Sequence, residues 1–205
     1  MQGYIIDFKP VRDDDLIVTI LTKDQVLTTY RFYGARHSHI NVGYKIDFET
    51  ESNLKSNIPR LKDVLHLNFP WILDHQKMYH WQRFVKLFYD HLKDVDEVED
   101  FYFELLSQLI HRIDKQNVIR ALLEGYIKIL EYEGRLHTEF ECLLCEQEVN
   151  DQVSLIRGFL PTHPKCCMGR GFDKKKIQTL FDDTSTIDLT DEDCEYIWHI
   201  LLLGI

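Results

Sequence analysis

The residues best suited to chemistry lie in one short segment, between positions 141 and 172. This segment holds four of the chain's five cysteines and one histidine: Cys142, Cys145, His163, Cys166 and Cys167. Two ligands separated by two residues form a tight turn that directs both side chains at one ion, and two such turns supply four tetrahedral ligands. The pairs 142/145 and 163/166 both have this spacing. Thiolates with one imidazole suit zinc, so we expect one zinc ion held by Cys142, Cys145, His163 and Cys166.

Such a Cys3His set is a closed site, because it leaves no position open for water or substrate. We therefore expect the zinc to be structural. The fourth ligand stays open at this stage, since Cys167 would give His163-x3-Cys167 in place of the symmetric spacing with Cys166. A metal-free segment with packed or redox-active thiols is the other interpretation. Against it, no thioredoxin-like βαβ pattern surrounds the cysteines.

The sequence offers no catalytic constellation. Zinc deaminases also use His and Cys ligands, but they need H-x-E, and here Pro164 and Lys165 follow His163. The phosphate-loop, dinucleotide-binding, zincin and serine-hydrolase motifs are all missing from the chain. We therefore expect no enzyme activity.

Composition and charge narrow the class of protein. The chain has 205 residues and a net charge of −10, with no long apolar run and no signal-like start. One domain or two small ones is expected, in the cytoplasm and without a membrane span. Residues 1–80 carry ten Lys/Arg and ten Asp/Glu, whereas residues 81–205 carry 14 and 24 and so account for the whole −10. Within the second part, residues 157–176 are locally basic, so the total charge does not describe every surface.

The pattern of hydrophobic residues predicts the strands and helices that would position the cysteines and His163. Five short runs rich in β-branched and aromatic residues predict strands at 3–9, 15–22, 26–34, 44–50 and 63–69, with turn-type residues between most of them. Five strands in this length favour a small Greek-key barrel, with an open meander or part of a sandwich as the alternative. Apolar residues at spacings of three and four then predict helices over 78–94, 97–113 and 116–133, the last one ending at Gly134.

Two further helices are predicted after the cysteine segment. One opens at Asp173, and the last begins after Thr190, which is followed by three acidic residues. Cys194 lies in the last helix, where we expect its side chain to be buried and packed in the core. The fold class is therefore α+β: a five-stranded OB-type barrel over residues 1–70, then a helical domain over 71–205. The zinc-binding insertion occupies about 138–172.

This arrangement resembles the bacterial RecO family of DNA repair proteins. "DDDLIVTILT" (13–22) and "YGAR" (33–36) are similar to family elements near the start, and "CLLC" and "HPKC" fall where zinc-bearing members carry two CxxC pairs. A histidine replaces one cysteine here. The basic run that usually follows "GAR" is reduced to "HSHINVG", and the chain is shorter than many relatives.

The resemblance implies a non-enzymatic recombination mediator with an OB-type N-terminal barrel. Such proteins bind single- and double-stranded DNA and anneal complementary strands. They act with RecR and sometimes RecF, engage the single-strand-binding protein SSB, and help to load RecA onto SSB-coated DNA.

Two sets of basic residues are candidates for contacts with DNA. On the barrel, Arg31 should face solvent while Tyr30 and Phe32 are buried, and Arg36 lies in the loop that follows. Beyond the cysteines, a second set surrounds the start of a helix, and it comprises Arg170, Lys174, Lys175 and Lys176. The latter set could equally meet a partner protein or be a solvated helix face. The alternative function is therefore a zinc-stabilised protein–protein adaptor without direct affinity for nucleic acid.

Overall fold

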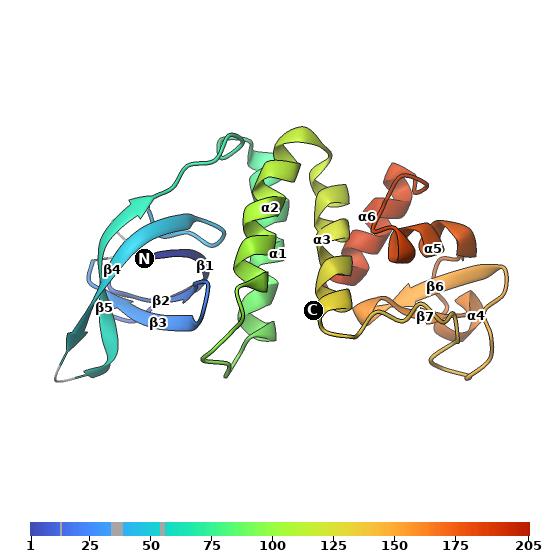
Figure 1. Cartoon of the computed structure of the whole chain (residues 1–205), viewed down its shortest axis with the longest axis horizontal. Coiled ribbons are helices and arrows are strands. Elements are labelled where there is room, and N and C mark those ends of the chain that lie inside the picture. The colour runs from blue at the N-terminus through green and yellow to red at the C-terminus, as the bar shows by residue number, and fades with distance from the viewer. Residues whose placement is uncertain (13, 34–38, 54–55) are drawn as a thin grey trace. The chain divides into compact units, whose positions relative to one another are not determined.

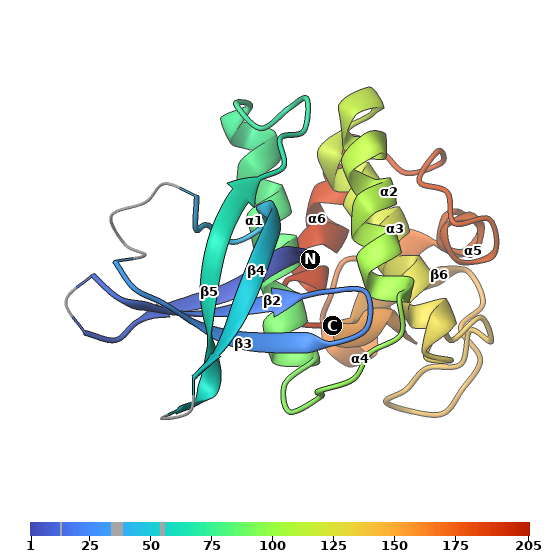
Figure 2. The same cartoon turned by 60° about the vertical axis from the view of Figure 1, so that its left-hand side comes forward.

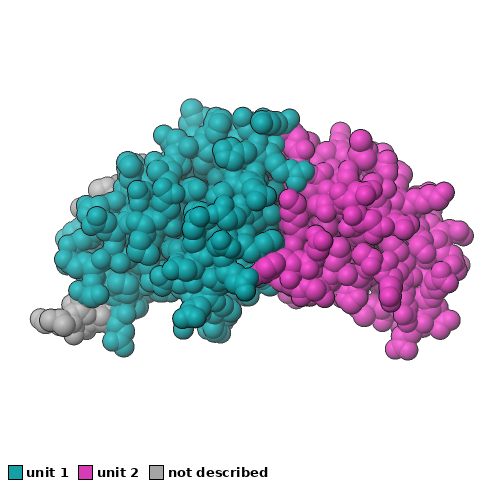
Figure 3. All heavy atoms as spheres, in the orientation of Figure 1, with its two compact units in different colours: residues 1–115 teal, residues 116–205 magenta. Residues whose placement is uncertain are grey.

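The structure is a computed structural model that describes residues 1–12, 14–33, 39–53 and 56–205. Spatial contacts divide the chain into two compact units, residues 1–115 and residues 116–205 (Figure 3). The first unit contains the strands of a barrel together with two helices that the sequence analysis grouped with the helical domain. The division into domains at residues 70 and 71 stays a prediction.

Five strands of the first unit close into a barrel (Figures 1 and 2). They are β1 (Gln2–Pro10), β2 (Leu16–Leu21), β3 (Val26–Arg31), β4 (Lys45–Asn53) and β5 (Ser56–His66). The order is β1-β2-β3-β5-β4, and β4 returns to pair with β1. All pairings are antiparallel except that of β3 with β5, which is parallel. This five-stranded barrel confirms the predicted fold class.

The barrel encloses an apolar core because alternate residues of each strand point inward. Its buried members come from four of the strands and from the segment before β4: Ile5, Leu16, Val18, Ile20, Ile40, Ile46, Phe48 and Leu61. The fifth strand exists, but its bounds differ from the predicted 63–69. It begins at Ser56, within a stretch taken for a turn, and ends at His66. The stretch forms a strand because its pairing with β4 outweighs the preference of its residues for a turn. Pro59 has no backbone N–H to donate, and it lies at a position of β5 where one hydrogen-bond donor can be missing.

Two helices of the first unit complete it, α1 (His75–His91) and α2 (Phe101–Lys115). The Asp74 carboxylate caps α1 by accepting from two backbone N–H groups, both at 3.1 Å. Trp81 of α1 is fully buried, packs edge-on against Tyr4 of β1, and donates from Nε1 to the carbonyl of Gly43 at 2.8 Å. The Tyr4 hydroxyl pairs with Ser107 of α2 at 2.9 Å. Both helices are thus fixed to the outside of the barrel.

The second unit is built on three helices, α3 (Val118–Tyr132), α5 (Lys174–Asp182) and α6 (Asp191–Leu201). All three were predicted, and their caps agree with the sequence signals. Gly134 has a φ of 65° just beyond α3, Asp173 caps α5, and Thr190 forms a capping box with Asp193. Cys194 is buried inside α6, as expected, and burial raises its pKa to about 11.

A small sheet that the sequence analysis missed supports the cysteine segment. Its strands are β6 (Gln152–Ile156), β7 (Leu160–Thr162) and β8 (Phe172–Asp173), in the order β7-β6-β8. The one-turn 3-10 helix η2 (Arg157–Phe159) connects β6 to β7, and the short helix α4 (Pro164–Cys167) follows β7. These strands are too short to give a two-residue period, which is why the sequence did not reveal them. No helix in the described ranges has the length and apolarity to cross a membrane.

Candidate metal centre and nucleic-acid surface

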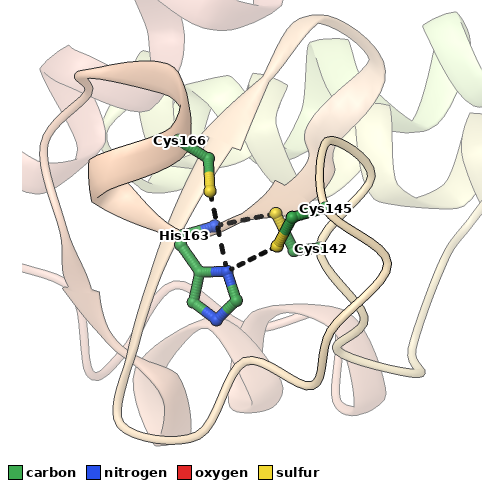
Figure 4. A group of neighbouring side chains, drawn as sticks. All are labelled: Cys142, Cys145, His163 and Cys166. Carbon is green, nitrogen blue, oxygen red and sulfur yellow. Dashed lines mark hydrogen bonds between the residues drawn. The ribbon is translucent and has the colours of Figure 1, made fainter.

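Four potential metal ligands meet in the second unit. The ligand atoms of Cys142, Cys145, His163 and Cys166 all lie within 4.8 Å of one another (Figure 4). The Cys145 and Cys166 sulfurs are 3.4 Å and 3.9 Å from Nδ1 of His163. Tetrahedral zinc with ordinary Zn–S and Zn–N bonds separates its ligand atoms by about 3.5–3.8 Å. The set therefore fits a metal such as zinc.

Each pair of ligands is held by a turn of the backbone. In the first pair, the Cys142 N–H donates to Gln147 and its carbonyl accepts from Glu146, at 2.9 Å and 2.8 Å. In the second pair, His163 follows β7 directly and stands at the N-cap position of α4, and Pro164 occupies the first helical position. The Cys166 N–H donates to the His163 carbonyl at 2.9 Å. The small sheet and the short helix thus bring the two pairs together.

Hydrogen bonds prepare this site for a cation. Burial disfavours the Cys142 thiolate, but backbone N–H groups of His163, Leu144 and Cys145 donate to its sulfur and lower its pKa to about 6. At His163, Nε2 lies 3.2 Å from the Glu148 carbonyl. A proton on Nε2 satisfies that carbonyl and leaves Nδ1 free to bind a metal, which is the usual outer support of a ligating histidine.

Cys166 and Cys167 have different surroundings. Cys166 points into the cluster, whereas the Cys167 sulfur accepts a hydrogen bond from Thr162 at 3.2 Å and lies beside Ser154. Desolvation and the neighbouring Cys145 and Cys142 thiols raise the pKa of Cys166 to about 11. The spacing left open whether Cys166 or Cys167 is the fourth potential ligand. The geometry groups Cys166, and not Cys167, with Cys142, Cys145 and His163.

The basic residues beyond the cluster are largely engaged by acids. Arg170 contacts Asp193 at 2.6 Å, and Lys176 lies 3.6 Å from the same carboxylate. Lys174 is 4.0 Å from Glu148 and lies over the Phe140 ring. Lys175 is exposed. The carboxylates lie up to 26 residues away in the sequence, so the charge pattern alone could not show that three of the four predicted contact residues are partly neutralised.

On the barrel the predicted faces are partly wrong. Phe32 was expected in the core, yet it is 42% exposed and packs on the ring of Tyr30. Arg31 was expected to face solvent, but it is half-buried and donates to the Leu61 carbonyl of β5 at 2.9 Å. The reason is that β3 ends at Arg31, so the strand alternation does not extend to the next residue. Arg36 lies outside the described residues.

An exposed aromatic and cationic cluster occupies this end of β3. The Arg60 guanidinium lies 4.4 Å from the centre of the Phe32 ring, and Tyr33, the next residue in the chain, is 56% exposed. Arg60 also lies 3.6 Å from Glu51. Sequence reasoning missed Arg60 because its approach to Phe32 depends on the parallel pairing of Tyr30 with Arg60. A stacking ring beside a guanidinium is the arrangement that OB barrels present to nucleic-acid bases.

These features define a class of protein: an OB-type barrel followed by helices, with a Cys3His cluster in the helical part. Comparison with known families makes the assignment specific. A family model described as RecO N terminal matches residues 1–85. That range includes the whole barrel and part of α1, so this part of the chain is similar to the RecO N-terminal domain, in agreement with the resemblance noted from the sequence. A search of the curated proteins finds no match.

Proposed function

We propose that this protein is a RecO-type mediator of homologous recombination and DNA repair that acts without catalysing a reaction. The observation that carries this proposal is the RecO N-terminal match over the barrel. The proposed activities are binding of single- and double-stranded DNA, annealing of complementary strands, and loading of RecA onto SSB-coated DNA. The proposed partners are RecR and SSB, with RecF and RecA as further ones. The proposed location is the cytoplasm, at the nucleoid during repair.

We assign single-strand binding to the cluster formed by Phe32, Tyr33 and Arg60. Its rings are exposed in a unit whose other large aromatic residues are mostly buried. Bases stack on such rings without sequence preference, and each stacked base contributes about 1–3 kcal/mol. Arg60 adds a phosphate contact or a cation–π contact. Arg36 lies a few residues beyond Tyr33 in the sequence and remains a proposed phosphate contact.

The other predicted DNA contacts rank lower. The guanidinium of Arg31 already donates within the barrel, and Arg170, Lys174 and Lys176 lie beside carboxylates. Displacing such a carboxylate costs part of the energy that a phosphate contact would provide. Arg60 bears a similar cost because it lies 3.6 Å from Glu51, but it also covers the Phe32 ring, which is 42% exposed and available for stacking. Lys175 is exposed and keeps its place among the proposed contacts.

Fluorescence anisotropy with a labelled single-stranded oligonucleotide tests this assignment. Replacing Phe32 and Arg60 together by Ala should weaken binding at least about tenfold, because a stacked base and one cation are lost. Losing Arg60 should also reduce the slope of log K against log salt by about 0.7. Undiminished affinity and slope in this variant would show that the DNA site lies elsewhere.

The chain offers a matched control on α1. Tyr79 is 55% exposed, and Arg83 lies over its ring at 5.4 Å. The Tyr79→Ala/Arg83→Ala variant removes the same kinds of group and the same charge from a different surface. It should bind DNA within about twofold of the unaltered protein, since general charge loss alone produces only a small change.

We further propose that the Cys3His cluster binds one structural Zn²⁺. When bound, the ion supplies a covalent-like link between the turn at Cys142 and the turn at His163, which are 21 residues apart. The chain's own residues do the rest: backbone N–H groups stabilise the Cys142 thiolate, and the Glu148 carbonyl orients the imidazole.

One observation favours the alternative of a protein–protein adaptor without DNA affinity. Three of the four basic residues beyond the cluster lie near carboxylates, which lowers the positive charge that this surface offers to DNA. The anisotropy titration separates the two functions, because an adaptor would not bind the oligonucleotide at any salt concentration.

A further inference from the structure

A pocket opens beside the first cysteine pair, and Cys142 and His137 form part of its wall. Its volume is about 230 Å³. Apolar side chains and carboxylates share its wall, and those that matter here are Glu139, Glu141, Leu143, Glu146, Leu160 and Pro161. The Leu143 N–H donates to the Pro161 carbonyl at 3.0 Å, which ties the turn to β7 and fixes the apolar part of the wall.

The pocket is rimmed by negative charge. Residues 136–156 contain five acidic residues and no lysine or arginine. Glu148 lies near Lys174, but among the described residues no ion pair involves Glu139, Glu141 or Glu146. All three are exposed. Three carboxylates around one small pocket repel each other and repel phosphate, so the surface favours a cationic occupant.

Apolar side chains are also exposed at this turn. Leu143 and Leu144, which separate the first two cysteines, are 53% and 54% exposed. Adjacent leucines on a turn that is held at both ends cannot withdraw into a core. Exposed apolar side chains rimmed by polar residues are typical of protein-binding surfaces.

We propose that this pocket binds an arginine side chain from a basic segment of a partner protein. The aliphatic stem of the arginine lies against Leu143, Leu160 and Pro161, and the guanidinium meets the carboxylates at the rim. Arginine suits the site better than lysine because its planar guanidinium donates to two carboxylates at once. An apolar residue next to the arginine covers Leu144.

This inference goes beyond the proposed function. It concerns the second unit and a protein ligand, whereas the DNA cluster lies on the barrel. The variants that test one do not touch the other, so each can fail alone.

The probe is a short fluorescein-labelled peptide of alternating arginine and leucine, compared with the same peptide in which citrulline replaces arginine. Citrulline keeps the shape of arginine and removes its charge. Anisotropy with the zinc-loaded full chain should show saturable binding of the arginine peptide and at least tenfold weaker binding of the citrulline peptide. The Glu139→Gln/Glu141→Gln/Glu146→Gln variant should also bind the arginine peptide at least tenfold more weakly.

A control variant loses three negative charges elsewhere in the same unit: Glu131→Gln/Asp182→Asn/Glu195→Gln, all at exposed positions. It should bind the arginine peptide within twofold of the unaltered protein. Zinc content and circular dichroism of both variants confirm that they fold.

Three results would overturn the proposal. The first is no binding of the arginine peptide, and the second is equal binding by both variants. The third is a second equivalent of zinc that the pocket variant loses and the control keeps, which would make the pocket a metal site.

Discussion

Exchanging each of two adjacent cysteines for serine tests the metal centre most sharply. Cys166 points into the cluster of ligand atoms, whereas Cys167 accepts a hydrogen bond from Thr162 outside it. The two variants, Cys166→Ser and Cys167→Ser, have the same composition and differ by one position. We expect the first to lose zinc affinity and the second to keep it.

The expected losses of stability for the two variants differ by about 2 kcal/mol. Serine cannot replace a thiolate in a closed zinc site, so we estimate a roughly thousandfold loss of affinity for Cys166→Ser. At a free zinc concentration about 100-fold above the dissociation constant of the unaltered protein, the variant stays about nine-tenths metal-free, and the loss of bound zinc lowers its free energy of unfolding by about 2.7 kcal/mol. A serine at 167 can still bond Thr162, so its effect should stay below about 1 kcal/mol.

The assay combines bound zinc per chain with urea unfolding of the second unit at a fixed free zinc concentration. Unaltered protein and Cys167→Ser should each carry one zinc and unfold at similar urea concentrations. Equal zinc content and equal stability in all three proteins would refute the reasoning. Loss of zinc in Cys167→Ser alone would show that the ligand was assigned to the wrong residue.

Three further predictions rest on other parts of the structure. Gly43→Ala should destabilise the first unit by about 2–3 kcal/mol in urea unfolding, because Gly43 has a φ of 84° and the added Cβ would lie 2.8 Å from the Trp81 ring. Arg120→Ala should lower the free energy of unfolding of the second unit by about 2–3 kcal/mol, because the Arg120 guanidinium donates to two backbone carbonyls of the 183–190 loop at 2.5 Å and 2.8 Å. The zinc content of this variant should not change. Zinc affinity should rise about tenfold per pH unit for each proton displaced, because the pKa of Cys166 is raised to about 11 and its thiol is protonated at neutral pH. A competition titration with a chelator from pH 6.5 to 8.5 measures the slope, and a flat profile would contradict it.

Much of the fold was predictable because it depends on local patterns of hydrophobic and turn-forming residues. The barrel strands β1 to β4 lie in β-branched runs with turn residues between them, and the long helices show their apolar spacing clearly. The errors arose where distant pairing decides the structure. β5 starts inside a turn-like stretch because it pairs with β4, and the three strands near the cysteines are too short to carry a period.

In the candidate sites, too, local features could be predicted and contacts between distant segments could not. The clustering of Cys142, Cys145, His163 and Cys166 could be predicted, since a tight turn at fixed spacing is a local property. Contacts between side chains from distant segments could not. Arg60 reaches Phe32 through the parallel pairing of two strands, and Asp193 approaches Arg170 from 23 residues away. Neither contact leaves a signal in the sequence.

Annealing of complementary strands is the measurement that tests the central claim most directly. Two complementary oligonucleotides carrying a donor and an acceptor dye are mixed with the zinc-loaded protein, and energy transfer is followed in time. A RecO-type mediator should accelerate annealing over the spontaneous rate, and the Phe32→Ala/Arg60→Ala variant should lose most of this acceleration while Tyr79→Ala/Arg83→Ala keeps it. Annealing at the spontaneous rate with the unaltered, zinc-loaded protein would contradict the account.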